Sequence, residues 1–178
     1  MEQTDSDLLR SAARGDEAAF HTLVDRHAAG LYRLARSLSA TEHDAEDVLQ
    51  ETLMAALRGA GSFDGRASVK TWLSRILMRQ AARAWNRERR SRAALPLEMA
   101  EPHAQPGNGA VRVDQRLDLS AVLNSLPEDH RQVLVLREVE QLSYAQIARV
   151  LNVPVGTVDS RLHRARREMR TRLEEYAR

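Results

Sequence analysis

Cysteine is absent from the 178-residue chain, so disulfide bonds and thiolate metal sites are excluded. Aromatic side chains make up only 4% of the sequence, although 43% of the residues are hydrophobic. A core of this composition must be built mainly from Leu, Val and Ala, which favours helices over a β-sandwich or barrel. No apolar run reaches the roughly 18 residues of a membrane span, and the start MEQTDSDLL does not resemble a secretory signal. We therefore expect a cytoplasmic protein without membrane insertion.

Proline is scarce, and its distribution divides the chain. Three of the five prolines and two of the eight glycines lie in the stretch PLEMAEPHAQPGNG, which has no helical periodicity. Such a composition is typical of a flexible linker. We expect two domains, residues 1–91 and 114–178, joined by a linker over 92–113. Hydrophobic residues elsewhere recur every three or four positions, so both domains are expected to be all-α.

The net charge of +2 hides an uneven distribution. Residues 1–51 carry 5 basic and 11 acidic side chains, whereas residues 66–92 carry 9 basic and 1 acidic. A second basic block, residues 149–172, carries 7 basic and 2 acidic side chains. Two separate basic blocks predict two contacts with a polyanion, and the acidic front half predicts a contact with something else.

Local signals set the helices of the first domain. Hydrophobic spacing predicts a helix over 16–38, and Thr41 with Asp44 forms a capping box that begins a second helix ending near Leu57. The Gly-rich stretch RGAGSFDGRAS is then expected to form a loop. Ser68 is the expected N-cap of the helix that follows this loop.

The most specific pattern lies in LSYAQIARVLNVPVGTVDSRLHRAR. Ser143 and Gln146 form a capping box, Asn152 suits the left-handed residue that ends a helix, and Pro154 suits the first turn of the next one. Two short helices joined by a tight turn predict a helix-turn-helix. Residues expected to face inward are Ile147, Ala148, Leu151, Val158, Leu162, Ala165, Met169 and Leu173.

The helix after Pro154 has two different faces. Polar residues near its start are placed to reach base edges in the major groove, and later arginines are placed to meet phosphates. The alternative is a solvated charged face, which the scarcity of balancing acids disfavours. The first group is Thr157, Ser160, Arg161 and Arg164, and the second is Arg166, Arg167, Arg170 and Arg172.

These residues carry a family resemblance. The stretch LPEDHRQVLVLREVEQLSYAQIARVLNVPVGTVDSRLHRARREMRTRL resembles region 4 of a bacterial extracytoplasmic-function (ECF) sigma factor. DAEDVLQETLMAAL, followed by SFDGRASVKTWLSRI, resembles region 2 of the same family. The resemblance implies a promoter-specificity subunit of RNA polymerase, in which region 4 reads the −35 element and region 2 opens the −10 element. It also implies an anti-sigma factor as a partner.

Four acids in the stretch DAEDVLQE raise a separate question. Asp44 and Glu46 oppose the positive end of the helix dipole, but Glu51 lies beyond its reach. A metal site using His43, Asp44 and Asp47 is a weaker alternative, and docking onto a basic partner would relieve the repulsion between acids. The resemblance implies that this helix binds the clamp helices of the polymerase β′ subunit. The implied contacts are Asp44, Asp47, Leu49, Gln50, Glu51 and Leu53, of which Leu49 and Leu53 could serve either the interface or, the favoured alternative, the core.

Four arginines recur every four residues in the helix after Ser68, namely Arg75, Arg79, Arg83 and Arg87. Such a stripe suits phosphate contact, with a solvated surface as the alternative. The resemblance implies that this helix and the preceding loop hold single-stranded −10 DNA with one base flipped out. The expected −10 contacts are Phe63, Arg66, Lys70, Trp72, Arg75, Arg79 and Arg83, and the expected −35 contacts are Thr157, Ser160, Arg161, Arg164 and Arg167.

The chain departs from the family pattern at three positions. Members often have an aromatic residue at the position of Val69, Tyr at that of Ser74 and Asn at that of Arg79. These differences leave the −10 base preference open and suggest that strand capture relies more on charge than on stacking.

Other functions explain less of the sequence. A stand-alone helix-turn-helix repressor or activator would give no role to the acidic helix or to the arginine stripe. A sigma mimic that only sequesters an anti-sigma factor would not need an arginine-rich recognition helix. Six scattered histidines and no cysteine offer no convergent acid–base site, so we expect neither an enzyme nor a cofactor or metal requirement.

Overall fold

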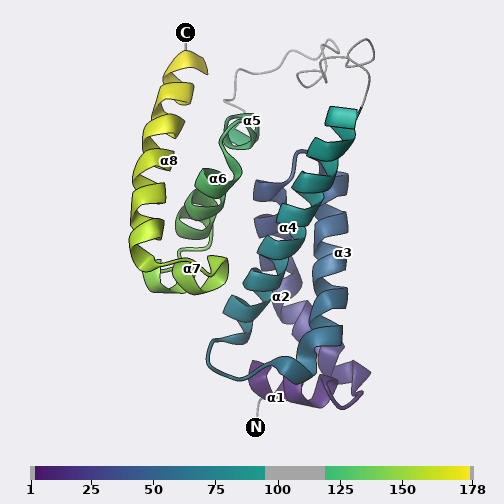
Figure 1. The fold of residues 1–178 in the computed structure, drawn as a ribbon. Coiled ribbons are helices and arrows are strands. Elements are labelled where there is room, and N and C mark those ends of the chain that lie inside the picture. Colours follow the sequence, from purple (N-terminus) through teal and green to yellow (C-terminus); the bar gives the residue numbers. More distant parts are fainter. Residues whose placement is uncertain (1–2, 95–118, 177–178) are drawn as a thin grey trace.

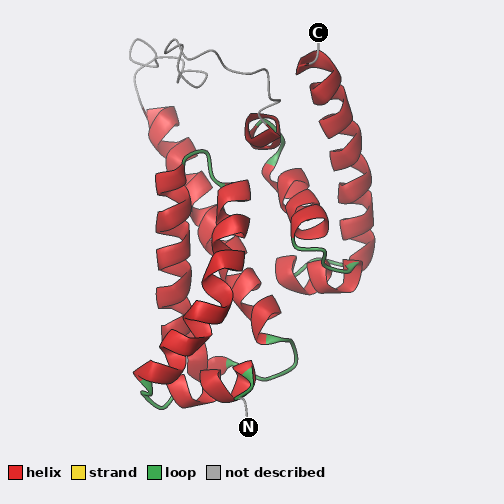
Figure 2. Ribbon diagram, turned by 180° about the vertical axis from the view of Figure 1, so that it is seen from behind, coloured by secondary structure: helices red, strands yellow, loops and turns green. Residues whose placement is uncertain are grey.

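The computed structural model describes residues 3–94 and 119–176, and all the regular structure in these two ranges is helical (Figure 2). The N-terminal half contains four α-helices and a short 3₁₀ turn, and the C-terminal half contains four α-helices and a π-helical turn. In chain order they are α1 (Asp5–Ala12), α2 (Glu17–Leu38), α3 (Glu42–Gly59), the 3₁₀ turn η1 (Ala60–Ser62), α4 (Val69–Ala94), α5 (Leu119–Asn124), α6 (Glu128–Leu134), the π-helical turn η3 (Val135–Val139), α7 (Tyr144–Leu151) and α8 (Val155–Tyr176).

The first four helices form a bundle in which successive helices pack on each other (Figure 1). Leucines at helical spacing fill its centre, among them Leu23, Leu34 and Leu77, none more than 1% exposed. Burial of such side chains is worth about 1.5–3 kcal/mol each. The leucine and alanine core predicted from the shortage of aromatics is therefore confirmed.

The expected caps set the helix starts. The Thr41 side chain accepts a hydrogen bond from the backbone N–H of Asp44, whose carboxylate accepts one from the backbone N–H of Thr41. Ser68 likewise accepts a hydrogen bond from the backbone N–H of Thr71 at the start of α4. The sequence predicts an end of this helix near Arg90, but α4 continues to Ala94. The rest of the predicted linker, 95–113, lies outside the described residues.

Helix α1 was not predicted. Thr4 caps it by accepting a hydrogen bond from the backbone N–H of Asp7, and Leu8 and Leu9 are buried against the bundle. The signal in the sequence is short: one cap, an acidic first turn and a pair of leucines. A helix of eight residues gains most of its stability from this packing on α2 rather than from its own propensity.

The helix-turn-helix forms as predicted from its local signals. Ser143 and Gln146 make both hydrogen bonds of a capping box, and Asn152 adopts the left-handed conformation with φ 55° and ψ 49°. Pro154 stands immediately before α8, where its carbonyl accepts hydrogen bonds from Thr157 and Val158. The inward-facing residues Ile147, Ala148, Val158, Leu162 and Ala165 are buried, Leu151, Met169 and Leu173 are half-buried, and Val150 is an additional buried residue.

One segment of this half departs from the prediction. The sequence predicts a continuous helix over 127–140, but its second part is the π-helical turn η3. Gln141 then has a positive φ of 54°. The wider turn lets the chain turn toward α7 while Val135 and Leu136 stay buried.

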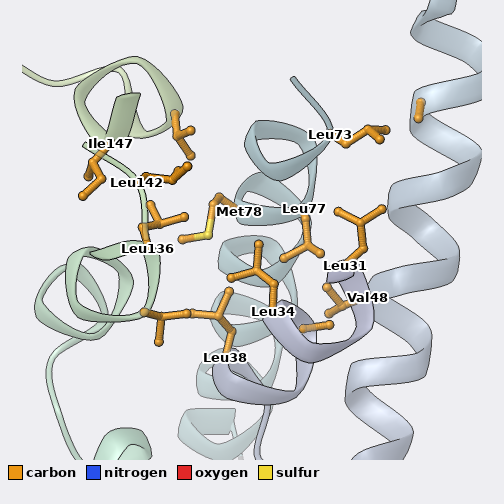
Figure 3. Packing of buried hydrophobic residues seen from close by; sticks show 14 of the residues in the cluster. Leu31, Leu34, Leu38, Val48, Leu73, Leu77, Met78, Leu136, Leu142 and Ile147 are labelled. Carbon is orange, nitrogen blue, oxygen red and sulfur yellow. The ribbon is translucent and has the colours of Figure 1, made fainter. Parts of the chain in front are cut away.

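The C-terminal helices pack against α4 and α2, so the two halves share one hydrophobic cluster. Figure 3 shows Met78 of α4 pointing toward Leu136 and Leu142. Polar contacts flank this apolar centre: Lys70 Nζ lies 3.2 Å from Glu140 Oε2, and the guanidinium of Arg131 lies 4.4 Å from the ring centroid of Trp85.

The side chain of Glu140 is only 7% exposed, and Arg131 is only 2% exposed. Both are charged residues of the C-terminal half that approach α4. The interface between the halves therefore has polar contacts at its edges and hydrophobic side chains at its centre. None of the described helices is long and apolar enough to cross a membrane.

Candidate docking and nucleic-acid interfaces

The acidic side chains of α3 have different environments. Asp44 Oδ2 lies 2.6 Å from Thr41 Oγ1 within the capping box, so this carboxylate is partly used by the fold. Asp47 and Gln50 are exposed, with 58% of the Asp47 side chain open to solvent. Among the predicted polar contacts of this helix, Asp47 and Gln50 are therefore the most available to a partner.

Glu51 already has a basic partner within the chain. Its Oε1 lies 3.2 Å from Arg87 Nη2 of α4. Arg87 is thus directed toward α3, and this ion pair relieves part of the repulsion expected along the acidic helix. An exposed pair of this kind contributes at most about 1 kcal/mol.

Two apolar residues on α3 were missed by the sequence reasoning. Met54 is 51% exposed and Leu57 is 47% exposed, and they continue the face that carries Asp47 and Gln50 by steps of three and four residues. Leu49 and Leu53 are half-buried and pack against the core, which is the role that the sequence favoured for them. The signal available in the sequence was the helical spacing of three and four residues, which continues from Gln50 to Met54 and Leu57.

The metal alternative at the start of α3 gains no support from the geometry. His43 Nε2 lies 3.8 Å from Asp47 Oδ2, which is a single loose contact between exposed side chains. Asp44 is turned into its capping box. Within residues 3–94 and 119–176, no three potential ligands converge on one point.

The basic stripe of α4 is exposed along part of its length. Arg79 and Arg83 are exposed, and Arg75 is half-buried. Lys70, at the start of the helix, is held by Glu140 of the C-terminal half. The exposed side chains of Arg79 and Arg83 are accessible to a phosphate group.

The loop before α4 brings two aromatic rings together. Phe63 and Trp72 meet edge to face, with ring centroids 5.6 Å apart and an interplanar angle of 67°. Both are half-buried, so part of each ring is open to a ligand. Beside them Arg66 Nε lies 3.5 Å from Asp64 Oδ2, and 89% of the Arg66 side chain is exposed.

The three positions that depart from the family pattern have different surroundings. Val69 is 3% exposed and Ser74 is 2% exposed, so both belong to the interior of the bundle. Arg79 is on the surface. Of these three substitutions, only the arginine presents a side chain that a strand of DNA can contact without rearrangement of the helix.

The start of α8 presents the predicted polar face. Ser160, Arg164 and Arg167 are exposed, and Thr157 is half-buried. Arg161 Nε lies 3.4 Å from Asp129 Oδ2 of α6, which leaves its side chain 28% exposed.

Arg166 is also engaged within the fold, because its Nη2 donates a hydrogen bond of 2.9 Å to Glu138 Oε1. This bond raises the pKa of the Arg166 guanidinium above its ordinary value. The later arginines are therefore not equivalent: Arg166, Arg167 and Arg170 are all exposed, but Arg166 is paired with Glu138.

Comparison with protein families gives matches in both halves. Residues 23–91 match sigma-70 region 2, and residues 116–169 match sigma-70, region 4. The chain is 39% identical over 167 residues to the ECF RNA polymerase sigma factor SigM of Mycobacterium tuberculosis, covering 93% of this chain and 82% of the relative. It is 29% identical over 187 residues to SigW of Bacillus subtilis, an ECF RNA polymerase sigma factor, covering 98% and 100% of the two chains.

Two solved structures are also similar to this chain over most of its length. CnrH in complex with the cytosolic domain of CnrY superimposes with a TM-score of 0.71 at 27% identity, covering 97% of this chain and 99% of the other. The sigma factor RpoE of Bartonella quintana, in complex with the anti-sigma factor NepR, gives a TM-score of 0.68 at 28% identity, covering 87% and 96%. The shared fold thus spans both halves.

Proposed function

Because the chain belongs to the ECF sigma factors of RNA polymerase, we propose that it binds core polymerase and directs it to specific promoters. Residues 1–91 would act as region 2 and residues 114–178 as region 4, joined by the linker 92–113. One observation carries this proposal: the chain presents a mixed acidic and apolar face on α3 and two separate basic surfaces, on α4 and α8. A DNA-binding repressor would need only one of the basic surfaces.

The docking surface for polymerase is the exposed face of α3. Asp47 gives charge complementarity to a basic helix of the β′ clamp, and Gln50 adds an amide that can hydrogen-bond. Met54 and Leu57 supply apolar area that becomes buried on binding. Asp44, in its capping box, and Glu51, in its ion pair with Arg87, add negative electrostatic potential to this surface. Leu49 and Leu53 support this surface from below, since they pack against the core.

Duplex DNA of the −35 element would be read by the start of α8. Ser160 and Arg164 are exposed at the end of the helix that a helix-turn-helix inserts into the major groove. Thr157 lies at the same end, and Arg167 would meet the phosphate backbone. Arg161 can contribute only after it leaves Asp129.

Single-stranded −10 DNA would follow α4. Arg75, Arg79 and Arg83 would bind its backbone, with Arg66 and Lys70 near the start of the helix, and Phe63 and Trp72 would stack on bases. Two of the positions that differ from the family, Val69 and Ser74, are buried. Base preference at the −10 element would therefore depend on the loop and its aromatic pair rather than on these two positions.

Both DNA contacts cannot be made in the packed arrangement. The −35 and −10 elements are separate stretches of the promoter, and each intervening base pair adds about 3.4 Å along the duplex. In the structure, Phe63 of the −10 loop and Arg149 of the helix-turn-helix line the same pocket. Promoter binding thus requires the C-terminal helices to leave α4, and polymerase is the partner that would hold the halves apart.

An anti-sigma factor is the second proposed partner. Two similar structures contain sigma factors bound to the cytosolic domain of CnrY and to the anti-sigma factor NepR. A protein that holds the halves of this chain together, or covers the α3 face, would prevent polymerase binding.

Run-off transcription tests the proposed function. Purified chain would be added to core polymerase on a library of promoter sequences, and the transcripts would be sequenced. The expected result is initiation from a subset of promoters that share elements near −35 and −10. Failure of the chain to bind core polymerase, together with no promoter-dependent transcripts, would contradict the proposal.

A further inference from the structure

An open pocket of about 490 Å³ lies where the loop before α4 meets the helix-turn-helix. Phe63 and Trp72 line it from the N-terminal half, and Arg149 and Asn152 line it from the C-terminal half. Figure 1 shows how α7, which carries Arg149, lies beside α4. The volume is in the range of small-ligand sites, and the site is complete only while the two halves are packed together.

The lining of this pocket carries excess positive charge. Arg66, Arg75 and Arg149 all contribute to it, and Asp64 is the only acid among the lining residues. Asp64 already lies 3.5 Å from Arg66. Cations that share a pocket repel one another, so an anion bound there would relieve a cost of the packed arrangement.

Two of the three arginines have unused hydrogen-bond donors. Arg75 Nε is buried and has no hydrogen-bond partner, and Arg149 makes no ion pair with any described residue. A guanidinium presents its N–H groups in a planar fork that matches phosphate oxygens. Arg75 and Arg149 belong to different halves, so one phosphate group between them would bridge the halves.

The aromatic pair indicates what kind of anion fits. Trp72 and Phe63 are half-buried at the same pocket, and their edge-to-face packing leaves ring surface on the pocket side. Such surface suits a planar base, because bases stack on aromatic side chains regardless of sequence. Asn152, in the turn, adds an amide that can donate to or accept from a base edge.

We propose that this pocket binds a nucleotide, with the phosphate held by Arg75 and Arg149 and the base against Trp72 and Phe63. The nucleotide stabilises the packed arrangement, because a ligand that binds one state shifts the equilibrium toward it. The chemistry is shared by a free nucleoside triphosphate and by a nucleotide of a short single strand. This inference goes beyond promoter recognition, because residues of both DNA-reading elements build a single site in the free protein.

Calorimetric titration of the full chain, without polymerase, tests the proposal. Three probes are used: ATP, inorganic tripolyphosphate and a single-stranded deoxynucleotide tetramer. We expect ATP or the tetramer to bind, and tripolyphosphate to bind at least tenfold more weakly than ATP because it has no base. Binding of ATP alone identifies a free nucleotide as the ligand, and binding of the tetramer alone identifies a strand.

Substitution of Arg149 is the critical comparison. Arg149→Ala is expected to weaken nucleotide binding at least tenfold, and Arg149→Lys by less, whereas Arg33→Ala removes an exposed arginine of α2 outside the pocket and changes affinity less than twofold. Circular dichroism verifies that each variant is folded. Equal affinity of the wild type and Arg149→Ala, no binding of ATP or tetramer, or equal binding of tripolyphosphate and ATP, would each overturn the proposal.

The failure of this inference is distinguishable from failure of the sigma function. Core binding is measured separately by co-purification with polymerase, and it does not depend on the pocket. Added core polymerase is expected to lower the affinity for the nucleotide at least tenfold, because it separates Arg149 from Trp72. Unchanged affinity on addition of saturating core would also overturn the proposal.

Discussion

Arg161 and Arg164 lie one turn apart on α8, and their surroundings differ. Arg161 is held 3.4 Å from Asp129, whereas Arg164 is exposed and has no ion pair among the described residues. A base contact by Arg161 must first compete with a carboxylate of its own chain. Arg164 can contact DNA without this cost, so the two residues should contribute unequally even though the sequence pattern treats them alike.

Replacement of Arg164 by alanine should weaken −35-dependent promoter binding by about 1–3 kcal/mol if its guanidinium reads a base edge. The loss should be concentrated at one base pair, as measured by transcription from promoters with single substitutions in the −35 element. Arg33→Ala is the matched control, since Arg33 is an exposed arginine of α2 with no predicted DNA contact. An equal loss on every promoter sequence would instead identify Arg164 as a phosphate contact.

Asp5 is the residue at which folding stability should depend on pH. Partial burial raises the pKa of its carboxyl, but hydrogen bonds from Arg26 and His27 outweigh this effect and lower the pKa below 3.8. The two contacts are 3.0 Å and 2.7 Å long and join α1 to α2. A carboxyl with a lowered pKa stabilises the fold at pH values above its ordinary pKa, and this contribution is lost as the pH falls through the lower, folded-state pKa.

The variant Asp5→Asn should therefore lower the free energy of unfolding at pH 7, by at most about 1 kcal/mol because the pair is partly exposed. The difference from the wild type should shrink as the pH falls below 3.8. Urea unfolding of both proteins at a series of pH values measures this difference in the free energy of unfolding. A difference that is the same at every pH would show that the charge of Asp5 does not stabilise the α1–α2 contact.

At the scale of single elements, α3 would combine a folding role and the proposed docking role on different faces. Ala45, Val48, Thr52 and Ala56 are buried in the bundle. The opposite face is exposed and carries both polar and apolar side chains. Because the faces are separate, a change on the exposed face should alter partner binding without unfolding the helix.

Reversal of charge at Asp47 tests this separation. Asp47→Lys should weaken binding to core polymerase and change stability by no more than about 0.5 kcal/mol, since the side chain is exposed. Asp25→Lys, on the exposed surface of α2, is a control of equal charge change. Binding of core at wild-type affinity by Asp47→Lys, or unfolding of this variant, would contradict the docking role of α3.

Elements with local signals could be predicted from the sequence, and elements that depend on distant contacts could not. Thr41, Ser143 and Asn152 act within three or four residues of themselves, and each forms the predicted cap. Helix α1 was missed because its stability comes from packing on α2. The π-helical turn was missed because it has only five residues, and over so short a segment the spacing of apolar residues does not distinguish a π-helical turn from an α-helix.

The same limit applies to the candidate site. The acidic pattern of α3 predicted a docking helix, but the sequence could not show that Glu51 pairs with Arg87 or that Lys70 pairs with Glu140. Those pairs join residues 36 and 70 positions apart in the chain. Ion pairs of this separation depend on which helix faces pack together, and that is decided by the tertiary fold.

At the scale of the whole molecule, the packing of the C-terminal helices on α4 would control access to the proposed DNA-binding surfaces. Met78, Leu136 and Leu142 form its dry centre, and Lys70 with Glu140 lies at one edge. Lys70 is one of the expected −10 contacts, so the same residue serves either the packed arrangement or DNA. Opening the molecule therefore frees a DNA contact as well as separating the halves.

Glu140→Lys should open the molecule, because it brings a second positive charge to a side-chain position that is only 7% exposed and faces Lys70. The radius of gyration from small-angle X-ray scattering should increase, with helical content unchanged. Glu138→Lys is the matched control, since Glu138 pairs with Arg166 within the C-terminal half. An unchanged radius of gyration in Glu140→Lys would show that this ion pair does not hold the halves together.

The central claim is that polymerase, rather than the free chain, makes promoter binding specific. Each half offers only a handful of phosphate contacts, so the free chain should bind duplex promoter DNA weakly and with strong salt dependence. Core polymerase should separate the halves and fix their spacing, which raises the effective concentration of the second contact after the first is made.

The most direct test is a mobility-shift titration on promoters with altered spacing between the −35 and −10 elements, with and without core polymerase, near physiological salt. The account predicts barely detectable binding by the free chain and a tight complex with core that weakens when the spacing changes. Tight, sequence-specific binding by the free chain that is indifferent to core and to spacing would contradict it.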